Sequence, residues 1–321
     1  MVKKLIISMV AVAAGVWASG LPEAYKPPVK PYEPPVKEPR VEKPEGKAPG
    51  AELHDVRFLF GVGGVAEADL PSAVAKLLIT LERRAAYLAK RNVVEPGPGE
   101  ARITVELYGC PDPGRALEIL TAPGLLELQA VSERDTFAER AGAAGWPAAR
   151  LLPYEHGNIV LLAAGDRDGF REAVKPTLAA AERLLWTRQL ESEEHGAVYK
   201  AALATGDGMA VTDVIDAAVV TGSGGNPEVH FDLGDRDATI FSGLTGRHLG
   251  EALAVVFDDE LFYTARVREQ TSKSGRIVGE LDEARAADIA LLLSSGSLPA
   301  TLTLLEYSVD GESRPVPHPT E

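Results

Sequence analysis

Hydrophobic positions along most of the chain follow two spacings, and each spacing predicts a different element. Between about residues 69 and 91 they recur every three or four positions, which is typical of an amphipathic helix. Residues 103–107 instead alternate between apolar and polar, as a half-buried strand does. With a weak strand at 56–60, a helix after Asp112 and a strand at 125–131, this region predicts an α+β fold with helices on one face of a sheet.

The middle of the chain has a less regular pattern. Residues 158–164 are apolar enough for a strand, and we expect a helix to begin at Asp166 or Asp168 and to continue to about Leu190. Three glutamates then follow within four positions, at 191, 193 and 194. We expect a solvated connection there, with a carboxylate site as the minor alternative.

The last 120 residues have the clearest pattern. Apolar and polar residues alternate in two segments, and Asp258-Asp259-Glu260 supplies a turn between two apolar runs. Asp282 is placed to cap a helix that Gly296 ends. The pattern predicts strands at 229–233, 252–257, 261–268, 276–278 and 301–306, and helices at 235–246 and from 282 to 296. We expect the tail, residues 308–321, to be loose.

Residues 1–20 have the layout of a secretory signal peptide. Lys3 and Lys4 precede a 13-residue apolar run, and Ala18-Ser19-Gly20 supplies small residues for cleavage. Thirteen residues rise only about 20 Å as a helix, which is less than the roughly 30 Å of hydrocarbon in a bilayer. We therefore expect cleavage and a periplasmic protein with no membrane span, and the alternative is retention as a single N-terminal anchor.

Residues 21–50 form a proline-rich segment that contains nine of the 23 prolines and two copies of Pro-Pro-Val-Lys. Proline fixes φ and removes backbone donors, so we expect an extended, disordered linker. A spacer that holds a folded domain away from a membrane or cell wall and a leader without a partner are both compatible with this composition.

The charge excludes several classes of partner. The chain has a net charge of −14, and because residues 1–50 are basic, residues 51–321 carry −17. Such an acidic body disfavours nucleic acid and anionic lipid. The single cysteine, Cys110, cannot form an internal disulfide, and no two of the six histidines have helical metal-ligand spacing. We therefore predict no enzymatic activity, no cofactor and no metal.

Several segments resemble the first periplasmic domain of SecD, a subunit of the bacterial SecDF protein-export complex. The most specific segment runs from Ala290 to Ala300 and includes Gly296, Leu298 and Pro299; Gly206 and Asp207 lie in a Thr-Gly-Asp element like the one that opens the family's head subdomain. The other similar segments are 228–233, 241–245, 253–258, 264–269, 277–279 with Gly279, 103–109, 113–120 and, weakly, 60–64.

The resemblance implies a ferredoxin-like base with an inserted α+β head. We assign residues 51–131 to the base with 300–307 as its candidate closing strand, 132–196 to a variable connection, and 197–299 to the head. SecD continues into membrane helices that use the proton gradient, whereas this sequence stops at Glu321, so we expect no motor of its own.

The leading hypothesis is a non-enzymatic, exported SecD-like domain. Its expected partners are unfolded or translocating polypeptides, with Sec translocase subunits as further candidates. The expected polypeptide-contact edge is the strand around Leu261, Phe262, Tyr263, Ala265 and Val267, which would accept an extended client by strand addition. The alternative is an envelope structural or interaction protein that reuses the module on its proline-rich spacer.

Overall fold

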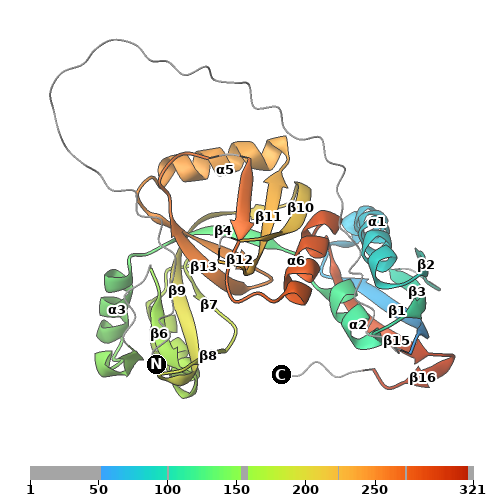
Figure 1. The fold of residues 1–321 in the computed structure, drawn as a ribbon, viewed down its shortest axis with the longest axis horizontal. Helices are drawn as coiled ribbons and strands as arrows, with labels where there is room; N and C mark the ends of the chain where they lie inside the picture. The colour runs from blue at the N-terminus through green and yellow to red at the C-terminus, as the bar shows by residue number, and fades with distance from the viewer. Residues whose placement is uncertain (1–51, 100, 153–157, 223, 272, 317–321) are drawn as a thin grey trace, which may run out of the picture.

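The computed structural model describes residues 52–99, 101–152, 158–222, 224–271 and 273–316. The predicted signal peptide at 1–20 and the proline-rich linker at 21–50 lie outside these residues. The described residues form a base at one end of the molecule and a larger head at the other, with α6 between them (Figure 1). The mixture of sheets and helices confirms the predicted α+β class.

The base is a five-stranded antiparallel sheet with the strand order β16-β15-β1-β3-β2. Its elements are β1 (His54–Gly63), α1 (Leu70–Leu88), β2 (Arg91–Pro96), β3 (Arg102–Cys110), α2 (Pro113–Thr121), β15 (Thr301–Val309) and β16 (Glu312–Arg314). Without β16, the chain order is βαββαβ and the strand order is fourth, first, third, second. This is the predicted ferredoxin-like arrangement, and the head is inserted between α2 and β15.

The base forms because the apolar faces of its helices and sheet match. Phe58 and Phe60 of β1 and Ile103 of β3 are fully buried beneath the helical face that carries Leu77 and Leu81. Asp112 caps α2, since its side chain accepts a hydrogen bond from the Arg115 amide at 3.0 Å. The sequence pattern therefore located both helices of the base.

Three details of the base differ from the sequence predictions. The helix predicted to reach residue 91 ends at Leu88, and the chain turns directly into β2, an edge strand that the pattern did not indicate. The strand predicted at 125–131 forms as β4 (Leu126–Val131) but pairs with strands of the head, not of the base. The predicted loose tail includes β16, which pairs with residues 307–309 of β15.

The centre of the head is a small barrel. It contains β4, β12 (Ala252–Phe257), β13 (Glu260–Arg266), β7 (Arg183–Trp186) and β9 (Gly196–Val211), and the pairing of β4 with β9 closes it. Four alanines, at 202, 204, 252 and 254, lie in its interior core with Val256 and Leu261. Small side chains fill the barrel because five strands enclose little space.

The helices α3 (Arg134–Ala143) and α4 (Arg167–Val174) share a second core with β6 (Val160–Ala163) and β9. Strands β6 and β8 (Leu190–Ser192) pair with β9, and β5 (Leu151–Leu152) pairs with β6. In this second core, Phe137, Trp146 and Phe170 make edge-to-face ring contacts. The helix predicted to reach Leu190 was wrong beyond Val174, because Pro176 falls within a 3-10 turn at Lys175–Thr177 and the chain then extends into β7.

The remaining part of the head is a three-stranded antiparallel sheet with the order β10-β11-β14. Its strands are β10 (Val214–Thr221), β11 (Pro227–Leu233) and β14 (Ser274–Ile277), and α5 (Asp235–Arg247) and α6 (Glu283–Ser295) pack beside it. Helix α6 contacts β10 and β11 on one side and α1 of the base on the other. The predicted cap is confirmed, since Asp282 accepts from the Arg285 amide at 2.8 Å.

Candidate functional site

Strand β10 presents an apolar edge. It is the first strand of its sheet and pairs only with β11 among the described strands. Ile215 is 67% exposed, Val219 41% and Val220 40%, so three of its eight residues are large, exposed hydrophobics. Soluble proteins normally protect a strand of this kind with charges, proline or a covering element. Asp216 is the one charged side chain on β10, and α6 reaches the strand at Ala217 through Ser294, so the exposed part of the edge lies around Ile215, Val219 and Val220.

The backbone of this edge has free hydrogen-bonding capacity. The Ala217 carbonyl lies 3.3 Å from the Ser294 hydroxyl of α6, so it points away from β11. Residues two apart on a strand direct their amides to the same side, which sends the Val219 amide outward as well. A hydroxyl has one hydrogen, and Ser294 makes its shorter bond, 2.8 Å, to the Ala290 carbonyl. Ser294 is therefore the neighbour of the Ala217 carbonyl, and in the described residues no side chain bonds to the outward amide of Val219.

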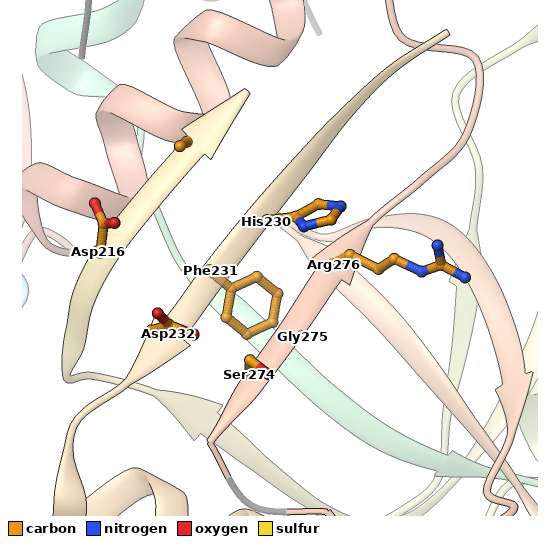
Figure 2. Close-up of a pocket in the computed structure, with 8 residues that line it drawn as sticks. Asp216, His230, Phe231, Asp232, Ser274, Gly275 and Arg276 are labelled. Atoms are coloured by element: carbon orange, nitrogen blue, oxygen red, sulfur yellow. The ribbon is translucent and has the colours of Figure 1, made fainter. Parts of the chain in front are cut away.

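The outer face of the same sheet is a shallow hollow of about 480 Å³. Figure 2 shows Asp216, Asp232 and Ser274 on the three strands, beside His230 and Arg276. Asp216, Asp232 and Ser274 lie in one row across the three strands, because Asp216 pairs with Asp232 and Asp232 pairs with Ser274. On the inner face the Phe231 ring lies across Gly275, where a β-carbon would overlap it. The hollow thus rests on a packed inner layer.

Charges on this face fall into two groups. Glu228 lies 3.1 Å from the His230 imidazole and 3.4 Å from the Arg276 guanidinium, so its carboxylate has cationic partners. Asp216 and Asp232 lie opposite each other on neighbouring strands, and in the described part of the chain neither carboxylate has a hydrogen-bond or ion-pair partner. The end of the hollow next to the β10 edge is therefore negative and uncompensated.

The edge predicted from the sequence lies elsewhere, on β13. Leu261 is 1% exposed inside the barrel and Val267 is 8% exposed in the main core, so neither side chain is at the surface. The Phe262 ring lies under the Arg285 guanidinium, and the Tyr263 hydroxyl donates to the Arg276 carbonyl of β14. Burial raises the pKa of Tyr263 to about 12. Of the five predicted contact residues only Ala265 is exposed.

The family-like residues near the start of the head have structural contacts. Gly206 of β9 has φ +90°, and a β-carbon there would lie 2.5 Å from that of Ala181. Asp207 accepts two hydrogen bonds from Arg247, at 3.0 and 3.2 Å, and lies 2.8 Å from the His248 imidazole. Hydrogen bonds from Arg247 and His248 hold the pKa of Asp207 below its usual value. These residues join β9 to the end of α5.

The family-like residues near the end of the head form the joint with the base. Gly296 has φ +90° and donates its amide to the Leu292 and Leu293 carbonyls at the end of α6. The Leu298 amide donates to the Pro123 carbonyl at 2.8 Å, which ties together the two segments that cross between base and head. Pro299 leads into β15, and Gly279 (φ +155°) lies near Phe262.

The part of the chain that the structure describes holds no cluster of metal-ligating side chains. No three His, Cys, Asp or Glu side chains there converge as a metal site would require. Cys110 is 1% exposed, and burial raises the pKa of its thiol, which lowers its reactivity.

Sequence reasoning missed β10 altogether. Its residues, Val-Ile-Asp-Ala-Ala-Val-Val-Thr, include four β-branched apolar residues, which favour a strand. The Asp-Ala-Ala centre weakens the alternation, and a bulge at Ile215 breaks it. The β-branched residues Val219, Val220 and Thr221, just before Gly222, were the signal that could have identified the strand.

Comparison with protein families gives a specific match. Residues 184–300 match the model for the SecDF P1 head subdomain. The chain is similar to the periplasmic P1 domain of SecD. The matched segment begins within β7 and includes β10, β11 and β14, so the candidate surface lies entirely within the SecD-like head. The resemblance seen in the sequence is thereby confirmed.

Individual relatives extend this similarity beyond the head. Protein translocase subunit SecD of Koribacter versatilis is 27% identical over 69% of this chain and 35% of its own length. SecD of Aquifex aeolicus is 28% identical over 67% of this chain and 35% of its own. The chain spans 35 to 41% of the length of the first SecD relatives. The SecD likeness is therefore to one part of those proteins.

Solved structures agree on the fold. A SecDF structure in a super-membrane-facing form has a TM-score of 0.52 and 22% identity, covering 83% of this chain and 32% of the other. A second structure, from work on SecDF as a membrane component that enhances protein export, has a TM-score of 0.51 and 23% identity. The match covers 81% of this chain and 100% of the other. In the described residues no helix is long and apolar enough to cross a membrane.

Proposed function

We propose that this chain is a non-enzymatic, exported, SecD-like periplasmic domain that binds unfolded or translocating polypeptides. The observation that carries the proposal is the β10 edge, which has no strand partner besides β11 in the described residues and exposes Ile215, Val219 and Val220. The outward direction of the Ala217 carbonyl implies that the Val219 amide faces outward too. An extended polypeptide would pair with β10 as a fourth strand, so that backbone hydrogen bonds supply sequence-independent affinity. Docking on Sec translocase subunits is the second part of the proposal.

This proposal moves the client edge from β13 to β10. Leu261 and Val267 are buried, and the Tyr263 side chain bridges β13 to β14, so that edge offers little free surface. We keep Ala265 and the exposed end of β13 as a secondary contact. The names of the relatives, protein translocase subunits, support a role in export.

The alternative function is an envelope interaction protein that uses the same module on its proline-rich spacer. It predicts one folded partner and no preference for unfolded clients. The exposed apolar edge favours the first proposal, because an unpaired strand recognises any extended backbone.

The test is binding of a fluorescently labelled, reduced and unfolded polypeptide to the full chain, compared with the same polypeptide folded. We expect binding of the unfolded form alone. Val219→Pro removes an outward amide donor without breaking a bond to β11, so it should weaken binding about fivefold to tenfold. Val219→Thr, which keeps that donor, should bind within about twofold of wild type.

A photocrosslinking amino acid at position 219, with one at exposed Ile240 of α5 as the control, locates the contact. Crosslinks from 219 but not 240 support the β10 edge. Equal binding by Val219→Pro and wild type, or capture in cells of one folded envelope protein and no unfolded client, would overturn the proposal.

A further inference from the structure

The side chains on the outer face of the β10 sheet determine which side chains suit each position of a strand that pairs with β10. Asp216, Ala218 and Val220 are two residues apart and lie on this face, because Ala217 and Val219 pair with the inward-facing Phe231 and Val229. A strand added to β10 would therefore place three alternate side chains beside an acid, a small residue and an exposed valine. The edge consequently distinguishes the two ends of a five-residue client segment.

The end of the outer face that carries Asp216 and Asp232 lacks a cationic partner in the described residues. Asp216 and Asp232 are direct cross-strand neighbours, and like charges in that position are destabilising. Glu228, at the other end of the face, has His230 and Arg276 as partners. Among the described residues no lysine, arginine or histidine is paired with either aspartate. A cationic side chain on the added strand would relieve the repulsion.

Resting on the proposed function, we infer that the β10 edge selects extended segments with a lysine or arginine four positions from an apolar residue. The basic side chain lies beside Asp216 and within reach of Asp232, while the apolar side chain covers Val220, which is 40% exposed. The small Ala218 between them leaves room for either kind of central side chain. The occupant is thus a basic, apolar polypeptide segment.

The test uses three nine-residue peptides with an alternating valine–threonine sequence. They differ at one position, four residues before a valine, which is lysine in the first peptide, glutamine in the second and glutamate in the third. Their binding to the full wild-type chain is measured by fluorescence anisotropy at low and at high salt. We expect the lysine peptide to bind about threefold more tightly than the glutamine peptide, the glutamate peptide to bind more weakly, and salt to shrink the differences.

The double variant Asp216→Asn/Asp232→Asn should bind all three peptides with equal affinity, near that of the glutamine peptide for wild type. Glu228→Gln, an acid that already has cationic partners, is the matched control and should keep at least half of the preference. Circular dichroism checks that each variant is folded.

The outcomes separate this inference from the function on which it rests. If the three peptides bind wild type equally while Val219→Pro still weakens binding, strand addition stands and the charge selection is wrong. If no peptide binds wild type, both fail. A preference for lysine that survives in the double aspartate variant also overturns the inference, since the cation would then be recognised elsewhere.

Discussion

The guanidinium of Arg84 donates a hydrogen bond to the Gly296 carbonyl at 3.0 Å, and so joins α1 of the base to the end of α6. Arg84 is fully buried, and its other donors reach the Ser295 hydroxyl and the last carbonyls of α2, Ile119 among them. A cation suits both positions, because the carbonyl ends of helices carry partial negative charge. Burial lowers the pKa of Arg84 to about 10, which leaves the side chain charged at neutral pH.

Replacing Arg84 should therefore destabilise the whole molecule. Arg84→Met keeps most of the volume but leaves buried carbonyls of two helices without donors, and we expect a loss of about 3 kcal/mol or more in the free energy of unfolding. Urea denaturation measures it. Arg83→Met on the exposed face of α1 is the control and should change stability by less than about 0.5 kcal/mol. Equal urea midpoints for Arg84→Met and Arg83→Met would contradict this role of Arg84.

Gly206→Ala should cost more than a glycine replacement at another left-handed position. The substitution adds backbone strain at φ +90° and a β-carbon 2.7 Å from the Ala181 carbonyl oxygen. We expect a loss of about 3 kcal/mol. Gly145→Ala has a similar φ, +85°, with no atom within 4 Å of the added carbon, so it should cost about 1 kcal/mol. Thermal denaturation of both variants tests whether the contact with Ala181 adds to the strain.

The stability of the junction between α5 and β9 should depend on pH through His248. Burial disfavours the charged imidazole, but its contacts with Glu251 at 2.6 Å and Asp207 at 2.8 Å outweigh this and raise the pKa of His248. A raised folded pKa stabilises the protein below the unfolded value, near 6.5, and this contribution is lost as pH rises through the folded value.

Wild type should therefore lose more stability between pH 5.5 and pH 8 than His248→Gln does, as measured by urea denaturation. Asp207 has a lowered pKa, so its contribution is present above about pH 4 and is lost in stronger acid. If the free energy of unfolding changes equally with pH in wild type and in the variant, the imidazole contributes nothing to the junction.

Cys110 should be unreactive in the folded protein. Its side chain is buried, and burial raises the pKa of the thiol, so little thiolate is present at neutral pH. A maleimide or disulfide reagent at pH 7 should label the folded chain at least tenfold more slowly than the same chain in concentrated guanidinium. Since the sequence has one cysteine, labelling measures this site alone. Rapid labelling without denaturant would mean that the base opens readily.

The elements that the sequence predicted well have local signals. Helix α6 has a capping aspartate, Asp282, and a terminating glycine, Gly296. The β12–β13 hairpin has an acidic turn at Asp258 and Asp259, both with positive φ. Such features depend on neighbouring residues, so one sequence is enough to find them.

The pairing of strands could not be predicted in the same way. Strand β4 lies beside α2 in the chain, but its partners β9 and β12 begin at Gly196 and Ala252. All six residues of β12 are buried, so no polar face indicates which sheet it joins. The candidate surface was missed for two reasons: the bulge at Ile215 hides the strand pattern of β10, and β10 becomes an edge only through the order of strands in its sheet.

The position of β15 has a consequence for how the chain folds. His54 and Asp310 are 256 residues apart in sequence, yet they lie 2.7 Å apart at the end of the base sheet. Until residues 301–309 emerge, β1 has only β3 as a partner, and its other side stays open while the whole head is made. Closure across so long a loop is slow. The base sheet can therefore be complete only after residues 301–309 have been made, and until then one side of β1 is an unpaired edge of the kind that can pair with other chains.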